Sequence, residues 1–150
     1  MKKAAPANET FDCALLLLEK KQLSREELRT QLISAGHLPP AVEEALGKTQ
    51  ALGYINDRLL AEALFSDGAR RGKGPLWLEQ KLRARGVEVK FVEHFVHLAT
   101  TSALKNAGEL LHREFPGDLL HRTQGRAYRK LISRGFAPEL AEEAVAAALL

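Results

Sequence analysis

Apolar residues recur along the chain at helical spacing, and one arrangement of them occurs three times. It reads Leu28-x3-Leu32-x3-Gly36, then Leu78-x3-Leu82-x3-Gly86, and finally Ala127-x3-Leu131-x3-Gly135. The three glycines are separated by 50 and 49 positions. A chain of 150 residues that holds three copies of one helical pattern is a repeat protein, and such repeats build extended surfaces more often than pockets.

The first copy predicts three helices. Apolar residues at i, i+3, i+4 and i+7 favour a first helix over residues 11–21. A capping box formed by Ser24 and Glu27 begins the second helix, because the serine hydroxyl and the glutamate carboxylate can each accept the other residue's amide. Gly36 is suited to end that helix, and Pro39 to open the third.

The second and third copies follow the same plan. We expect Asn56 to cap a helix, Pro75 to open the next one and Pro138 to open the last. The sequence at 115–118 breaks the first helix of the third copy, and one helix is expected to lead from there to Gly135. No segment alternates with a period of two residues, so the sequence predicts nine helices and no strands.

These elements define the expected architecture, an all-α chain of three tandem three-helix repeats in an elongated, curved array. Each unit has about 45 residues, which is too few to bury a stable core alone, so packing between neighbouring repeats must add stability. The expected division is a flexible tail at 1–10, followed by repeats at 11–54, 55–100 and 101–150.

Composition narrows the class of protein. Apolar residues make up 45% and charged residues 27% of the chain, which is typical of a globular fold and argues against wholesale disorder. The single cysteine, Cys13, excludes an intramolecular disulfide and indicates a reducing compartment. The longest apolar run, Ala14 to Leu18, is too short to cross a membrane, and the first residues lack a signal-peptide pattern. We therefore expect a soluble, cytoplasmic protein.

The distribution of charge is more informative than the net charge of +3. Residues 1–54 hold seven basic and seven acidic side chains, whereas 70–90 hold seven basic and two acidic ones. Residues 121–134 hold five basic side chains and no acidic one. Most charge runs are solvated surface, but two acid-poor blocks at equivalent places in successive repeats favour an anionic partner, either nucleic acid or an acidic protein surface.

The candidate binding residues lie in these two blocks. At 100° per residue, a helix places Arg122, Arg126, Arg129 and Lys130 on one strip opposite an apolar face. The segment Arg70-Arg71-Gly72-Lys73-Gly74-Pro75 lacks the spacing of the P-loop, the phosphate-binding loop of nucleoside triphosphatases. It is expected instead to be a mobile basic loop whose free amides contact anions. Trp77 fits a packing anchor at least as well as an interface residue. The full set of candidates is Arg70, Arg71, Lys73, Trp77, Lys81, Arg85, Arg122, Arg126, Arg129, Lys130 and Arg134.

Catalytic chemistry is not favoured. His94 and His97 are spaced i, i+3 but lack the cysteines or carboxylates that would complete a metal site. Paired glutamates such as Glu43 and Glu44 are explained by the electrostatics of helix ends. Because no nucleophile–base pair and no cofactor fingerprint is found, we expect a protein that is not an enzyme and that has no catalytic residue, no cofactor and no metal.

A series of motifs runs through nearly the whole chain in a fixed order. They are Ala14-Leu15-x-Leu17-Leu18, Ser24-x2-Glu27-Leu28-x3-Leu32, Gly53-Tyr54-Ile55-Asn56-Asp57, Ala61, Arg70-Arg71-Gly72-Lys73-Gly74-Pro75-x2-Leu78-x3-Leu82-x3-Gly86 and Lys130-Leu131-x2-Arg134-Gly135-Phe136. In these motifs the chain resembles the RecX family of bacterial regulators of the RecA recombinase. Asn56 departs from the family, which commonly has aspartate there. The resemblance implies three tandem three-helix repeats that bind in the groove of a RecA–single-stranded-DNA filament and inhibit the recombinase without catalysis.

Two main hypotheses follow, beside a third option, a structural adaptor for some other acidic partner. The first is a monomeric, non-enzymatic modulator that lies along a RecA filament and reduces its ATPase, strand-exchange and coprotease activities, and so affects recombination, DNA repair and the SOS response. Its basic strips would face carboxylates of adjacent protomers, phosphates of the single-stranded DNA, or both. The alternative is a direct DNA-binding protein, either sequence-nonspecific or similar to a helix-turn-helix protein, with the basic helix of the third repeat in a major groove.

Overall fold

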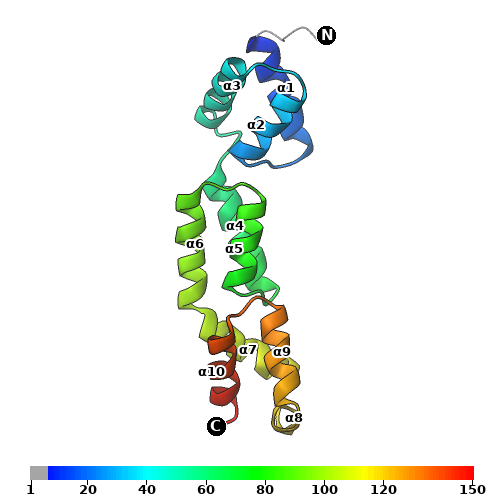
Figure 1. Ribbon diagram of the computed structural model, residues 1–150, viewed down its shortest axis with the longest axis vertical. Coiled ribbons are helices and arrows are strands. Elements are labelled where there is room, and N and C mark those ends of the chain that lie inside the picture. The colour runs from blue at the N-terminus through cyan, green and yellow to red at the C-terminus, as the bar shows by residue number, and fades with distance from the viewer. Residues whose placement is uncertain (1–6) are drawn as a thin grey trace.

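The computed structural model describes residues 7–150, and over these residues the chain is helical with no strand. The helices form an elongated molecule of three tiers, with the N-terminal repeat at one end and the C-terminal repeat at the other (Figure 1). In chain order the helices are α1 (Ala7–Lys20), α2 (Arg25–Ser34), α3 (Pro39–Ala51), α4 (Asp57–Arg70), α5 (Pro75–Ala84), α6 (Val89–Thr101), α7 (Ala103–Glu114), α8 (Asp118–Arg122), α9 (Gln124–Ser133) and α10 (Pro138–Ala148). The predicted all-helical, elongated repeat is confirmed.

The first repeat consists of α1 to α3. Ser24 and Glu27 form the predicted capping box at the start of α2. Helix α1 begins at Ala7 rather than Phe11, so part of the segment expected to be a tail is helical. Thr10 is fully buried and its hydroxyl lies 2.7 Å from Nδ1 of His37, which ties the start of α1 to the end of α2. The rest of the expected tail, residues 1–6, lies outside the described residues.

The second repeat consists of α4 to α6, and the third of α7 to α10. The Asn56 side chain accepts a hydrogen bond from the amide of Leu59 and caps α4, as predicted. The prediction of nine helices is wrong for residues 7–150, because the chain leaves helical geometry at Thr123 (φ −133°, ψ 36°). This break separates the five-residue helix α8 from α9.

The apolar core is divided into three clusters, one for each repeat. The leucines of the repeated pattern are central to them: Leu28 and Leu32 are fully buried, as are Leu82 and Leu131. Each cluster keeps to its own stretch of the chain: the first extends to Ile55, the second covers residues 60–95 and the third 103–145. The first two buried sets include the small residues Ala14 and Ala61, which are fully buried. Each buried cluster therefore lies within one repeat, and the repeats must be joined by contacts outside these clusters.

The repeats are joined through their middle helices, α2, α5 and α9, which stack end to end in the same direction (Figure 1). The amide of Gly74 donates to the carbonyl of Arg134 (2.7 Å), and the Ser24 hydroxyl donates to the carbonyl of Arg85. A helix end normally leaves amides or carbonyls without partners. Here a donor at the start of one middle helix bonds to a carbonyl at the end of the next. Helices α2, α5 and α9 thus form one end-to-end column through all three repeats.

Candidate partner-binding surface at the junction of repeats two and three

The second junction, where the end of α9 meets the start of α5, is a close contact between backbones. In addition to the Gly74 bond, the amide of Leu76 donates to the carbonyl of Gly135 (2.9 Å). Gly135 has a φ of +95°, and a Cβ there would lie 2.6 Å from the amide nitrogen and the Cβ of Trp77. A Cβ on Gly74 would lie 2.6 Å from the Gly135 oxygen. Both positions require glycine, because any side chain would separate the two helices.

This contact brings together basic residues that are far apart in the sequence. Arg71 and Lys73 precede α5, Lys81 lies on α5, and Lys130 and Arg134 come from α9 and its end. Three of these cations lie over the Trp77 ring, with Arg71 and Lys73 at 5.8 Å and Lys81 at 5.9 Å from its centre. We call Arg71, Lys73, Lys81, Lys130 and Arg134 the junction cluster.

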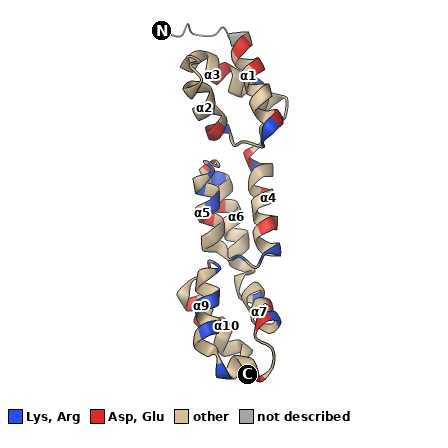
Figure 2. Ribbon diagram, turned by 90° about the vertical axis from the view of Figure 1, so that its right-hand side faces the viewer, with Lys and Arg blue, Asp and Glu red and all other residues tan. Residues whose placement is uncertain are grey.

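The crowding of the cluster is strongest at Lys73. Partial burial lowers the pKa of this ammonium, and the positive charges of Arg134, Arg71, Lys130 and Lys81 lower it further. Like charges disfavour one another's charged forms when they are close. Cations from both basic blocks of the sequence thus meet at the second junction, and Lys and Arg positions lie along both α5 and α9 (Figure 2).

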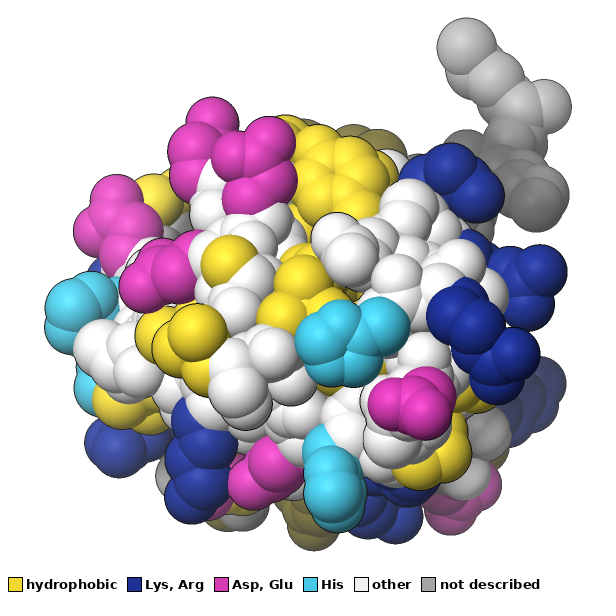
Figure 3. Space-filling model, turned by 90° about the horizontal axis from the view of Figure 1, so that it is seen from below, with side chains coloured by type: hydrophobic (Ala, Val, Ile, Leu, Met, Phe, Trp, Pro, Cys, Tyr) yellow, Lys and Arg dark blue, Asp and Glu magenta, His cyan; other side chains and the backbone are white. Residues whose placement is uncertain are grey.

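The remaining cations of the third repeat extend this surface toward the end of the molecule. Arg122, Arg126 and Arg129 are exposed. The expected strip on a single helix is wrong in one respect, because Arg122 ends α8 while Arg126 and Arg129 belong to α9. Seen from the end of repeat three, Lys and Arg gather over α8 and α9, and Asp and Glu over α10 (Figure 3).

Two candidates from the second repeat are engaged within the molecule. Arg70 is an exposed side chain that pairs with Asp67 at 2.9 Å. Arg85 reaches across the first junction, where its Nε donates to the Glu27 carboxylate at 2.9 Å and its Nη2 to the carbonyl of Gln22 at 2.9 Å. In the charge pattern Arg85 cannot be distinguished from its neighbours, but the structure gives it a joining role.

The loop before α5 differs from its expected form. The amides of Arg71, Gly72, Lys73 and Gly74 all donate to backbone carbonyls, those of Asp67, Ala69, Gly68 and Arg134. None of these four amides is free to bind an anion, so the expectation of free loop amides is wrong. Trp77 also serves as a packing anchor, because its ring lies against Gly68 of α4, where a Cβ would be 2.6 Å from a ring carbon. The groups that this loop leaves available for contacts are therefore its side chains.

The first junction, between the end of α5 and the start of α2, is built from polar side chains. The Ser24 hydroxyl accepts from the amide of Glu27 (3.0 Å) and donates to the Arg85 carbonyl. Burial raises the pKa of the Glu27 carboxyl, but the hydrogen bonds from Arg85 and the Ser24 amide, with the charges of Arg85 and Lys21, lower it below its ordinary value. Glu27 is therefore held ionised.

Sequence reasoning missed the part played by Asp57 at this junction. Its two carboxylate oxygens accept from the amide of Arg25 (2.9 Å) and the amide of Glu88 (3.0 Å), so one side chain joins the starts of α2 and α6. An aspartate at the start of a helix is expected to serve that helix alone, and nothing in its local pattern indicates two distant partners.

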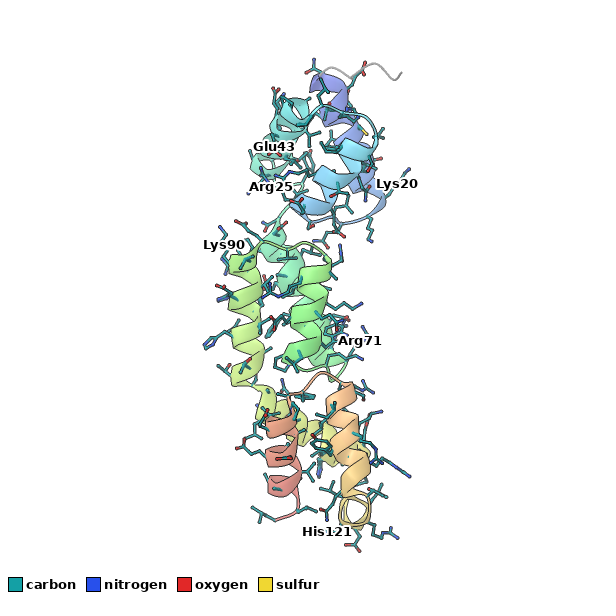
Figure 4. All side chains as sticks on the ribbon, viewed as in Figure 1. Lys20, Arg25, Glu43, Arg71, Lys90 and His121 are labelled. Carbon is teal, nitrogen blue, oxygen red and sulfur yellow. The ribbon has the colours of Figure 1, made fainter. Side chains whose placement is uncertain are left out.

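Glu43 also differs from its expected role, which was to act near a helix end. It lies one turn inside α3 and pairs with Arg29 (2.7 Å) and Arg25 (3.5 Å), as the adjacent Arg25 and Glu43 labels indicate (Figure 4). Arg71 lies instead at the end of repeat two that faces repeat three. Three cations of the first repeat, Arg25, Arg29 and Lys48, are therefore neutralised within that repeat, while the second junction leaves Lys73 and Lys81 without an ion pair among residues 7–150.

Neither a metal centre nor a membrane span is found in the described part of the chain. No group of three or more histidine, cysteine, aspartate or glutamate side chains there is placed to hold a metal ion. None of its helices combines the length and apolar character needed to cross a bilayer. What the geometry defines is an all-helical repeat scaffold with one strongly basic surface, which is the form of a binding protein.

Comparison with known proteins places this scaffold in a family. The family model described as "RecX, second three-helix domain" matches residues 56–97. A regulatory protein RecX of Thermus thermophilus is 38% identical over 91% of this chain and 90% of its own length, and one of Halorhodospira halophila is 31% identical over 99% and 94%. The chain belongs to the RecX family of regulatory proteins.

Solved structures show the same fold. The crystal structure of RecX from Lactobacillus salivarius aligns with a TM-score of 0.77 at 20% identity, covering 96% of this chain and 97% of that one. A second crystal structure, of a regulatory protein RecX, aligns with a TM-score of 0.69 at 18% identity over 91% of this chain and 70% of that one. At these identities the similarity establishes the arrangement of the helices.

Proposed function

We propose that this chain is a non-enzymatic regulator that binds a RecA-type recombinase filament on single-stranded DNA and inhibits its ATPase, strand-exchange and coprotease activities. The observation that supports this most directly is the junction cluster, in which cations of two repeats converge with few acidic partners. Such a surface attracts the anionic face of a nucleoprotein filament. The family membership supports a regulatory role, and the RecA recombinase, which the resemblance to this family implies as the partner, is the protein to test.

An elongated array is suited to a filament. The cations extend from Arg71 to Arg122 along two repeats, so the surface can contact more than one repeating unit of the partner. Linking several weak contacts on one rigid chain raises the overall affinity, because after the first contact the others form at high effective concentration. Inhibition then needs no chemistry from the regulator, only occupancy that opposes ATP turnover or strand access.

The decisive experiment titrates the protein into RecA assembled on single-stranded DNA and follows ATP hydrolysis. We expect turnover to fall in a saturable manner, and the triple substitution Arg122→Glu, Arg126→Glu and Arg129→Glu to weaken the effect at least tenfold. A matched control reverses three exposed cations elsewhere, Lys20→Glu, Arg58→Glu and Lys105→Glu. Unchanged turnover at saturating wild-type protein would refute the proposal, as would equal loss in both triple variants.

Binding to bare DNA separates the proposal from the direct DNA-binding alternative. A protein acting on DNA alone should bind naked duplex or single strands tightly, with an affinity that falls steeply with salt. A filament regulator should bind RecA-coated DNA much more tightly than bare DNA at the same ionic strength. Equal affinity for the two substrates would favour the alternative.

A further inference from the structure

The junction cluster has more positive charge than its own acidic neighbours can neutralise. Asp67 is shared between Arg70 and Arg71 (2.9 and 3.3 Å), and Glu114 between Lys130 and Arg134 (3.6 and 3.8 Å). Lys73 and Lys81 have no carboxylate partner among residues 7–150 and instead lie over the Trp77 ring. The positive charge that is least neutralised is therefore that of Lys73 and Lys81.

The types of side chain indicate which anion fits. The planar fork of arginine matches both carboxylates and phosphates, whereas a lysine binds a phosphate as a point charge. What distinguishes the two anions at this site is the number of negative charges that each can supply to adjacent cations. Both arginines of the cluster are already committed: Arg71 to Asp67, and Arg134 to Glu114 and to the carbonyl of Arg71 at 2.9 Å. Lys73 and Lys81 are left without an ion pair among residues 7–150, and Lys130 shares the single charge of Glu114 with Arg134. Several adjacent unneutralised cations are matched better by a ligand with many negative charges, such as a chain of phosphates, than by one protein carboxylate.

We propose that the second junction is a binding site for a phosphate-rich polyanion, held by Lys73, Lys81 and Lys130 and tying repeats two and three together. Lys73 and Lys81 belong to repeat two and Lys130 to repeat three, so one ligand is contacted from both sides of the junction. The site itself does not depend on the proposed function. Only the source of the phosphates, the DNA strand of the filament, rests on it. Free polyphosphate is the other source of the same chemistry.

Ligand binding at this site has a mechanical consequence. The cations that crowd Lys73 repel one another across the junction, and an anion between them removes that repulsion. An anion also favours the ammonium form of Lys73, so its binding weakens as pH rises through the lowered pKa of this lysine. The occupied junction is more rigid than the free one.

Trp77 is the only tryptophan of the chain and provides the measurement. Its fluorescence is followed while the isolated protein is titrated with sodium tripolyphosphate and, separately, with a short oligothymidylate, at constant ionic strength set with sodium acetate. We expect a saturable change with both ligands, and an affinity at least tenfold lower in Lys73→Gln and in Lys130→Gln. The control is Lys105→Gln on α7, which changes the charge equally at an exposed position outside the cluster.

The outcomes are distinguishable. A saturable change with tripolyphosphate alone supports the site and assigns it to free phosphates, and one with both supports the DNA strand as well. A change no larger than that produced by acetate, or an equal loss in Lys105→Gln, overturns the inference. Circular dichroism shows that each variant is folded. If neither ligand binds and the wild-type protein still inhibits RecA turnover, this inference fails while the proposed function stands.

Discussion

The two junctions of the molecule occupy equivalent positions and are built by different chemistry. At the first junction, Ser24 caps α2 and binds the end of α5, and Glu27 pairs with Arg85. At the second junction, the equivalent positions are Gly74 and Trp77, and the contact is made by backbone atoms. The first junction neutralises its charges within the chain. The second junction is brought close by glycines, and it leaves Lys73 and Lys81 without an ion pair among residues 7–150.

This difference shows how one repeat can serve two purposes. The pattern of leucines that builds each core is independent of the residues at the helix ends, so the ends can diverge without loss of fold. An ion pair at a junction neutralises the two charges that form it, whereas a backbone contact at glycine neutralises no side-chain charge. A repeat array that must both hold together and present charge can therefore separate these tasks between its junctions.

The largest expected effect comes from breaking the backbone contact with Gly135→Ala. The left-handed backbone strains any residue with a Cβ, and this Cβ would clash with Trp77 at 2.6 Å, so we expect a loss of about 3 kcal/mol by these two principles. Urea denaturation followed by Trp77 fluorescence measures it.

A matched control is Gly53→Ala. Gly53 also has a positive φ, +81°, but a Cβ there meets nothing within 4 Å. Only backbone strain applies, and we expect a loss of about 1 kcal/mol. Equal losses in the two variants would show that closeness at the second junction is unimportant.

The next effect concerns the serine of the first junction. Ser24→Ala removes the cap of α2, which costs about 1 kcal/mol, and leaves the part-buried Arg85 carbonyl without its donor, which costs about 1 kcal/mol more. Thermal denaturation followed by circular dichroism measures the sum. Thr30→Ala is the control, because the Thr30 hydroxyl bonds only to the carbonyl of Glu26 on the exposed side of α2, and its loss should be within about 0.5 kcal/mol.

Acid should weaken the first junction selectively. The pKa of Glu27 is lower in the folded protein than in the unfolded chain, so its contribution is complete above the ordinary glutamate pKa and is lost as pH falls through the lowered value. Glu27→Gln should cost about 1 kcal/mol at neutral pH and nothing at low pH. Denaturation of the two proteins at a series of pH values tests this, and a difference that persists in acid would refute the assignment.

The smallest expected effect is at the ion pair inside repeat one. The Arg29 and Glu43 side chains are 31% and 50% exposed, and pairs this open contribute about 0.5 kcal/mol or less. Arg29→Gln should therefore change stability by no more than that in the same urea titration. A larger loss would mean that charges within a repeat matter as much as those at its junctions.

The sequence predicts the interior of each repeat well because the determinants are local. The leucine spacing identifies buried positions such as Leu32 and Leu82, the Ser24–Glu27 spacing identifies a cap, and Pro75 identifies a helix start. Each of these depends on residues within one or two turns. The all-helical class follows from the same signals.

The junctions could not be predicted because their partners are distant in the sequence. Ser24 and Arg85 are 61 positions apart, and the Arg134 guanidinium and the Arg71 carbonyl are 63 apart, so no local spacing relates them. The break at Thr123 was missed because the segment has no proline there. For the candidate site, the charge pattern identified the basic blocks, but it could not show that Arg85 is committed internally or that Lys73 is the centre of the cluster.

In the end-to-end column, the length of each middle helix determines the spacing and the relative rotation of neighbouring repeats. Helices α2, α5 and α9 each have ten residues, or about 15 Å of rise. Adding one residue to α5 would lengthen the column by about 1.5 Å and turn the next repeat by about 100°, so the cations of repeat three would point away from those of repeat two. The number of residues in a middle helix thus sets both the distance between the cations of successive repeats and the direction in which they face. Only a partner whose anionic groups repeat at the same distance and direction could contact all of them.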